Sequence, residues 1–263
     1  MAIYTDQSGK TISLTSLPVR IVSLVPSQTE LLYDLGLDAA VVGITKFCIH
    51  PQQWFRNKKR TGGTKSVHIE QVKALQPDLI IANKEENVKE QVDELAAQFP
   101  VWTSDISNLE QALQMISSIG EITGTSIKAQ AMVAAINNRF TQLKIKKANT
   151  RTAYLIWQHP YMSIGAGTFI HDMLTRCGFE NIFQDQQRYP IITIEEIKNR
   201  NCQLLLLSSE PFPFKKEHLQ ELQKQLPSTK IILADGEMFS WYGSRLLLVP
   251  AYFESMINKM AEA

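Results

Sequence analysis

The sequence predicts an α/β protein of two lobes, each with a Rossmann-like parallel sheet, joined by a single long rigid helix. Short apolar runs alternate with segments of helical period along the chain, which is typical of layered α/β units. The apolar runs are continuous rather than alternating, as in parallel strands that are covered on both faces. We expect strands at residues 20–25, 40–44, 78–82, 100–103, 152–158, 203–208 and 230–234.

Helices are expected between these strands, at residues 69–75, 86–99 and 108–122, the last closed by Gly124. A longer helix is predicted from Thr125 or Ser126 to about Lys147, because this stretch has no proline or glycine. At ~1.5 Å per residue it would span ~30 Å, so we interpret it as a stiff connector. The predicted division is an N-terminal lobe over 1–124, a connecting helix over 125–148 and a C-terminal lobe over 149–263.

Composition excludes several classes of function. The 263 residues include 27 basic and 26 acidic side chains, a balance that argues against a broad nucleic-acid surface. No apolar run reaches the ~18 residues of a transmembrane helix. The first ten residues have no features of a signal peptide, which predicts a cytoplasmic protein as written, or a periplasmic or cell-envelope protein if a leader was removed. The three cysteines show no CxxC spacing, so a disulfide framework is not expected.

Ligands of open α/β sheets bind in the loops that follow the carboxyl ends of the strands. In the N-terminal lobe this rule selects the loops at residues 26–28, 45–50 and 83–87, and we add the turn at 61–65. In the C-terminal lobe it selects residues 158–162, 209–214 and 235–245. These loops combine aromatic side chains with a few polar ones, a mixture that suits a flat, partly apolar ligand.

Cys48 and His50 are separated by one residue near a strand end. A thiolate and an imidazole are good ligands for a soft or borderline metal, although a structural zinc site needs four ligands. The alternative interpretation is a buried thiol beside a loop histidine. A third hypothesis is a metal-dependent enzyme that uses Cys48 and His50 in the same site.

Several segments, in this order, carry a family resemblance that covers about residues 18–260. They are Arg20–Leu32, Val42–Pro51, Ile69–Ala82, Glu90–Leu95, Arg176–Phe183 and Gly243–Arg245. On these segments the chain resembles the binding proteins whose lobes are joined by one long helix and which serve ABC importers of vitamin B12, ferric siderophores and haem. It is most similar to the cobalamin-binding branch.

The resemblance implies a non-catalytic receptor with no intrinsic cofactor, whose ligand is a corrinoid, haem or ferric siderophore held in a cleft between the lobes. Aromatic residues would supply flat contact area, and basic residues, with Arg188 among them, would pair with acidic groups of the ligand. His50 or Cys48 is a candidate axial ligand for the metal of the bound chelate. The candidate ligand-binding residues are Pro26, Ser27, Gln28, Lys46, Phe47, His50, Lys65, Asn83, Lys84, Tyr161, Met238, Trp241, Tyr242 and Arg245.

The resemblance also implies a permease partner, while the protein itself is expected to be a monomer that binds no nucleic acid. Family members dock through one glutamate per lobe, and the matching positions here are Lys89 and Ser240. The nearby Glu85, Glu86 and Glu237 are the candidate docking residues instead. Thr64 and Asn83 are polar where the cobalamin branch tends to have aromatic residues. A cytoplasmic cofactor-binding protein that kept the fold stays an alternative.

Overall fold

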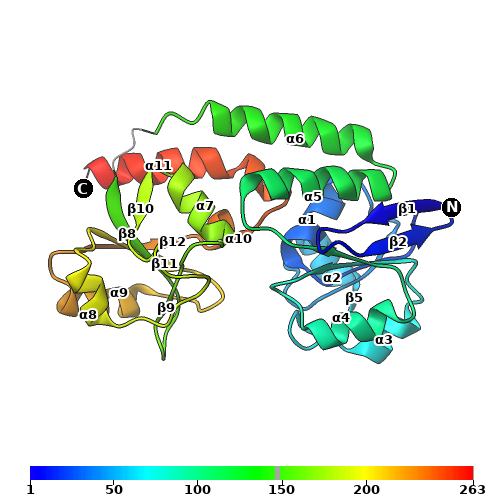
Figure 1. Ribbon diagram of the computed structural model, residues 1–263, viewed down its shortest axis with the longest axis horizontal. Coiled ribbons are helices and arrows are strands. Elements are labelled where there is room, and N and C mark those ends of the chain that lie inside the picture. Colours follow the sequence, from blue (N-terminus) through cyan, green and yellow to red (C-terminus); the bar gives the residue numbers. More distant parts are fainter. Residues whose placement is uncertain (146–148, 263) are drawn as a thin grey trace. The chain divides into compact units, whose positions relative to one another are not determined.

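The computed structural model describes residues 1–145 and 149–262, and its chain forms two compact units. The first unit comprises Met1–Ile106, Glu110–Arg139 and Trp241–Leu247. The second unit comprises Ser107–Leu109, Phe140–Ser240 and Leu248–Ala263. The segment Trp241–Leu247 therefore belongs to the first unit although the chain on both sides of it belongs to the second (Figure 1).

The first unit contains a parallel sheet with the strand order β5-β4-β3-β6-β7. Its central strands are built from aliphatic residues such as Ile21, Leu79 and Ile80, which are fully buried because helices cover both faces of the sheet. The strands are β3 (Ile21–Ser23), β4 (Val41–Ile44), β5 (Lys59–Arg60), β6 (Leu79–Asn83) and β7 (Val101–Ser104).

Six helices accompany this sheet. Gly124 has a φ of +71° and ends α5, as a glycine in the left-handed region after a helix does. The next helix returns close beside α5, because Gly120 leaves no room for a Cβ against the side chain of Ala129. The helices are α1 (Pro26–Asp34), α2 (Gln52–Asn57), α3 (Ile69–Ala74), α4 (Lys89–Ala96), α5 (Leu109–Ile122) and α6 (Ser126–Thr141).

A separate antiparallel hairpin of β1 (Ala2–Thr5) and β2 (Thr11–Leu14) precedes the sheet. The carboxylate of Asp6 organises its turn by accepting from the amides of Ser8 and Lys10. The turn also contacts β7, where Thr103 donates its amide to Asp6 at 3.2 Å and accepts from the amide of Gln7 at 3.1 Å. The hairpin is thereby attached to the last strand of the first unit's sheet.

The second unit has its own sheet, with parallel strands in the order β10-β8-β11-β12 and β9 antiparallel beside β8. Leu204 to Leu207 lie in the centre of this sheet and are fully buried. The strands are β8 (Thr150–Trp157), β9 (Met162–Ser163), β10 (Phe179–Asn181), β11 (Leu204–Ser208) and β12 (Lys230–Ala234).

The helices of the second unit have ordinary end signals. Thr168 caps one helix by accepting from the amide of His171, and Thr193 with Glu196 forms a capping box on the next. These helices are α7 (Phe169–Arg176), α8 (Ile194–Asn199), α9 (Lys216–Gln225), α10 (Glu237–Ser240) and α11 (Val249–Glu262). The short helix η1 (Ser244–Leu247) belongs instead to the first unit, where it packs against α1.

The α/β class with two parallel sheets is confirmed, and each of the seven expected strands is present within a few residues of its predicted bounds. The expected helix to Lys147 is wrong in its end, because α6 stops at Thr141, after Asn137 and Asn138 have lowered its helix propensity. Its 16 residues span about 24 Å. Residues 146–148 of the predicted connector lie outside the described residues. The elements that the sequence did not predict are β1, β2, β5, β9, β10, α2 and α10.

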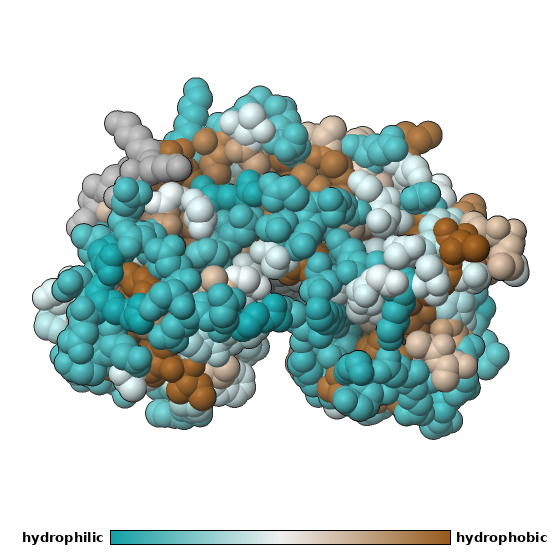
Figure 2. All heavy atoms as spheres, viewed as in Figure 1, coloured by the Kyte–Doolittle hydropathy of each residue, from teal (hydrophilic) through white to brown (hydrophobic). Residues whose placement is uncertain are grey.

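The surface carries a group of apolar side chains around the hairpin. Polar residues dominate over α3 and α4, and hydrophobic ones gather over β1 and β2 (Figure 2). Ile3, Val19 and Ile127 are 66%, 67% and 87% exposed. Among the described residues, no helix is both long enough and apolar enough to span a membrane.

Candidate functional site

The candidate site is built from loops at the carboxyl ends of the strands, and each unit presents its own set. In the first unit, β3 leads into α1, β4 leads into the loop 45–50, β5 into 61–65 and β6 into 83–87. In the second unit, β8, β11 and β12 lead into the loops at 158–161, 209–215 and 235–236. The positions of these loops follow from parallel pairing, which brings the carboxyl ends of neighbouring strands to one edge.

The start of α1 is an interior feature of the first unit. Pro26 occupies the first turn, and Val25, in the capping position, offers no side-chain acceptor. Ser27 and Gln28 are buried, and Gln28 donates from Nε2 to Ser104 Oγ at 2.5 Å. Within the described part of the chain, Ser27 Oγ and Gln28 Oε1 have no hydrogen-bond partner. Burial leaves these three predicted site residues little surface, and a direct ligand contact from them stays a prediction.

The loop after β6 is held by two asparagines. The Oδ1 atom of Asn83 accepts from the amides of Glu85 and Glu86, and its Nδ2 donates to Ser104. Asn87 accepts from the amide of Asn83 at 2.8 Å. Because these bonds hold the chain in an asparagine turn, α4 begins at Lys89 rather than at Glu86 as predicted. Asn83 is only 1% exposed, so its evident role is to fix the loop.

The loop after β4 has an exposed and a buried part. Phe47 is 51% exposed, and Lys46 Nζ lies 5.1 Å from the centre of its ring. Cys48 is fully buried, where its sulfur accepts from Thr29 Oγ1 at 3.1 Å and lies 3.2 Å from Thr45 Oγ1. This loop therefore offers a ligand an aromatic face and a cation.

The thiol of Cys48 is poorly suited to metal binding or nucleophilic chemistry. Burial raises its pKa to about 11, although the hydroxyls of Thr29 and Thr45 act in the opposite direction. The neighbouring His50 has its ring 5.5 Å from that of Trp241 in an edge-to-face contact. No cluster of three or more His, Cys, Asp or Glu side chains suited to a metal ion occurs among the described residues. The structure thus gives no support to the Cys48–His50 metal site or to the metal-dependent enzyme.

The segment Trp241–Leu247 is fastened to the first unit by polar contacts. Arg245 donates to Glu30 from Nε at 2.9 Å and from Nη2 at 2.7 Å, and its guanidinium stacks 4.7 Å from the ring of Trp241. Tyr242 donates its hydroxyl to Glu86 Oε1 at 2.7 Å. The side chains of Arg245 and Glu30 are only 9% and 17% exposed. Burial raises the pKa of Glu30, against the opposing hydrogen bond and charge of Arg245.

These contacts change how the predicted site is interpreted. Arg245, expected to pair with acidic groups of a ligand, is paired with Glu30 inside the protein. Trp241 and Tyr242, expected to supply contact area, are both buried. Gly243 allows this packing, because a Cβ there would lie 2.5 Å from the carbonyl oxygen of Ser27. The sequence resemblance had detected a conserved-looking segment, but the pairing across 215 residues needed the structure.

The predicted lysines and docking glutamates lie on or near the same loops. Lys84 pairs with Asp105 at 2.5 Å, and Lys65 donates to the carbonyl oxygen of Glu85. Both lysines are exposed, so these contacts can exchange with solvent. Glu85 and Glu86 are half-buried in the asparagine-held loop, and Glu237 opens α10 in the second unit.

The second unit contributes an aromatic cluster at the ends of β8 and β11. Trp157 is 40% exposed and meets Phe212 at 5.8 Å between ring centres. Phe212 also contacts Phe214 at 4.8 Å and His218 at 5.3 Å. Tyr161 is half-buried in the loop after β8, and Met238 is half-buried in α10. Sequence reasoning selected the loop of Phe212 but missed this residue, whose signal was the alternation Pro-Phe-Pro-Phe at 211–214.

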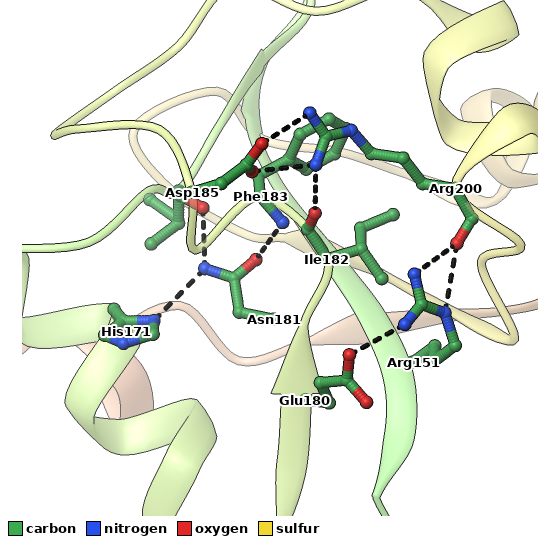
Figure 3. A network of polar contacts seen from close by, with 9 residues as sticks. Arg151, His171, Glu180, Asn181, Ile182, Phe183, Asp185 and Arg200 are labelled. Carbon is green, nitrogen blue, oxygen red and sulfur yellow. Dashed lines mark hydrogen bonds and ion pairs between the residues drawn. The ribbon is translucent and has the colours of Figure 1, made fainter.

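A polar network stabilises another part of the second unit, around β10 (Figure 3). Arg200 forms a bidentate pair with Asp185 at 2.7 and 3.0 Å and stacks on Phe183 at 4.9 Å. The hydrogen bond from Arg200 lowers the pKa of Asp185. Arg151 joins the network by donating to the carbonyl oxygen of Arg200 and to Glu180. All these groups are matched within the protein, which indicates a structural role.

A conserved turn of the same unit lies close to this network. Asn181 donates to the carbonyl oxygen of Ile164 at 2.8 Å and contacts His171 at 3.2 Å (Figure 3). Burial lowers the pKa of His171. Arg188, another basic residue expected to meet a ligand, donates to the carbonyl oxygen of Gly167 and lies over Tyr189 at 5.7 Å. The glycine-rich stretch 163–168 is thus a packed turn.

Two parallel-sheet units with aromatic and polar strand-end loops define a non-enzymatic class of α/β binding protein. The family model described as "Periplasmic binding protein" matches residues 21–230, and the chain belongs to this family. A curated relative, a vitamin B12-binding protein of Salmonella paratyphi A, is 25% identical over 246 residues, covering 89% of this chain and 91% of the relative.

Solved structures share the fold. A periplasmic heme-binding protein from Pseudomonas aeruginosa has a TM-score of 0.78 at 20% identity, covering 91% of this chain and 92% of that one. An ABC-type Fe3+-hydroxamate transport protein from Saccharomonospora viridis has a TM-score of 0.72 at 15% identity, covering 100% and 99%. The predicted family is confirmed, and the chain is a binding protein rather than an enzyme.

Proposed function

We propose that the protein binds a metal-chelate small molecule, namely a corrinoid, haem or ferric siderophore, for delivery to an ABC importer. The observation that carries this proposal is the match to a vitamin B12-binding protein over 89% of the chain. Solved relatives for heme and Fe3+-hydroxamate extend the ligand class to metal chelates in general. The ligand is cargo, so the protein needs no resident cofactor.

The exposed side chains of the strand-end loops support this ligand class. Phe47 in the first unit and Trp157 in the second are 51% and 40% exposed, and both lie at the carboxyl ends of strands. Large aromatic faces in such loops are suited to planar or macrocyclic ligands. Lys46, beside Phe47, adds a cation for acidic groups on the rim of the ligand.

The partner and the compartment follow from the same family. We propose that Glu85, Glu86 and Glu237 form the acidic contacts with the importer, because these carboxylates lie on loops or helix starts near the ligand loops. We also propose that the protein works in the periplasm or cell envelope, the compartment for which its family is named.

Ligand titration tests the proposal directly. Protein free of ligand would be titrated with cyanocobalamin, haemin and a ferric hydroxamate, and binding would be followed by calorimetry and by tryptophan fluorescence. Saturable binding of one of them with a Kd of ~1 µM or tighter is the expected result. Replacing Phe47→Ala or Trp157→Ala should each weaken that affinity by roughly tenfold, since an aromatic anchor contributes ~1–3 kcal/mol.

The matched control is Ile127→Ala, an exposed apolar side chain on α6 that is remote from every strand end. It should leave the affinity unchanged. If none of the three chelates binds, or if all three variants bind like the parent protein, the proposed function is wrong.

A further inference from the structure

The loop between β11 and α9 is fastened at its far end by a histidine. The amide of Lys215 donates to Nδ1 of His218 at 2.9 Å, across the first turn of α9. Glutamate or glutamine usually fills this position of a helix start, because its side chain can accept from the capping residue. A histidine can do the same only while Nδ1 is unprotonated, so the structure requires the neutral ring with its proton on Nε2.

The same ring is packed into the aromatic cluster of this loop. It meets Phe212 at 5.3 Å and Phe214 at 5.7 Å, both edge-to-face. Phe214 is 5% exposed and belongs to the core of the second unit, whereas Phe212 reaches the exposed Trp157. His218 therefore connects the helix start, the unit's core and the exposed aromatic surface.

We propose that His218 is an acid-sensitive lock on the loop 209–215, which the neutral imidazole holds in place and the imidazolium releases. Protonation of Nδ1 would set two N–H donors against each other, so the hydrogen bond to Lys215 would be lost. The amide of Lys215 would then lack its partner, and the loop would lose its attachment to α9. The charged side chains of the elements packed around the ring are Glu210 and Lys215 of the loop and Lys216, Glu217 and Glu221 of α9.

The other end of the loop is fixed independently of pH in this range. Ser208 Oγ donates to the carbonyl oxygen of Glu210 at 2.5 Å, and the amide of Phe214 donates to the carbonyl oxygen of Ser208. Release should consequently be local, freeing the Lys215 end and Phe212 while β11 stays in place. The consequence for ligand binding rests on the proposed function, in which the aromatic surface of Trp157 and Phe212 receives the ligand.

Amide exchange tests the lock without any ligand. The protection factor of the Lys215 amide would be measured by NMR at pH ~8 and pH ~5.5, with the ring carbon shifts of His218 reporting its charge. Protection should fall roughly five- to tenfold as His218 becomes charged, the effect of one lost hydrogen bond. In His218→Gln, whose side chain accepts without titrating, protection should be the same at both pH values.

The control His68→Gln removes an exposed histidine of the first unit and should keep the pH response of the parent protein. Unchanged protection of Lys215 while His218 becomes charged would refute the lock, and so would an equal loss in His218→Gln. Circular dichroism would verify that each variant is folded.

Cyanocobalamin or haemin affinity at the same two pH values forms a second arm. Weaker binding at pH ~5.5 in the parent protein, but not in His218→Gln, supports the lock. A loss of protection in a protein that binds neither chelate would refute the proposed function and leave the lock standing. Tight binding with constant protection would do the reverse.

Discussion

The buried pair of Arg245 and Glu30 allows a sharp test of how Trp241–Leu247 is held. Replacing Arg245→Met keeps an apolar stem against Trp241 but removes both hydrogen bonds to Glu30. The carboxylate, 17% exposed, would then be desolvated without its cation. A charge-assisted hydrogen bond contributes ~1.5–3 kcal/mol, and breaking one partner of a buried pair costs ~3–5 kcal/mol, so we expect a loss of about 3 kcal/mol at pH ~8.

The loss should shrink in acid. Burial already raises the pKa of Glu30 in the folded protein, and removing Arg245 takes away the groups that oppose this shift. A raised folded pKa means that the group's contribution to stability is present below its unfolded pKa and is lost as pH rises through the folded value. The variant should therefore lie closer to the parent protein at pH ~5 than at pH ~8, because Glu30 can bind a proton instead of remaining charged.

The assay is urea unfolding in a Trp157→Phe background. The remaining tryptophans, Trp54, Trp102 and Trp241, all lie in the first unit, so fluorescence then reports that unit alone. The control Lys10→Met breaks an exposed pair with Asp93 in the same unit and should cost less than ~1 kcal/mol. A cost below ~0.5 kcal/mol for Arg245→Met at pH ~8, or one that does not change with pH, would refute the reasoning.

Three further results are expected. Cys48, with a pKa raised to about 11 by burial, should resist thiol reagents at pH ~8 until the protein unfolds, and rapid labelling of the native protein would contradict its burial. Gly165→Ala should destabilise the second unit by ~1–3 kcal/mol in thermal unfolding, because the new Cβ would overlap the carbonyl oxygen of Gln186; an unchanged Tm would show that the turn can yield. Asn83→Ala should cost ~2–3 kcal/mol and expose the amide of Glu85 to exchange, whereas continued protection of that amide would mean that something else holds the loop.

Sequence patterns were sufficient for the framework and insufficient for its connections. Buried strands such as Leu204–Ser208 are predictable, because a parallel strand covered on both faces must be apolar throughout. The hairpin of residues 2–14 escaped prediction, since its strands are mostly exposed and carry no continuous apolar run. Its one usable signal was the turn with Gly9 at a φ of +86°.

The candidate site was predictable in its loops but less so in its residues. The strand-end rule selects the loop of Phe47 correctly, because topology alone fixes where it lies. It cannot tell that Asn83 turns inward to bind its own loop, since this depends on amides two and three residues ahead. Nor can it tell that Arg245 is already matched, because its partner Glu30 is 215 residues away.

The hydrogen bonds between the hairpin turn and Thr103 have a consequence for solubility. A strand at the margin of a sheet offers unsatisfied amides and carbonyls on which another chain can assemble. Here Asp6 and Gln7 occupy both backbone groups of Thr103, so the margin of β7 is closed by the protein's own first residues. The cover comes from the opposite end of the first unit's sequence, about a hundred positions before the strand it protects. A truncated chain that starts after the hairpin would keep its sheet and open it to intermolecular association.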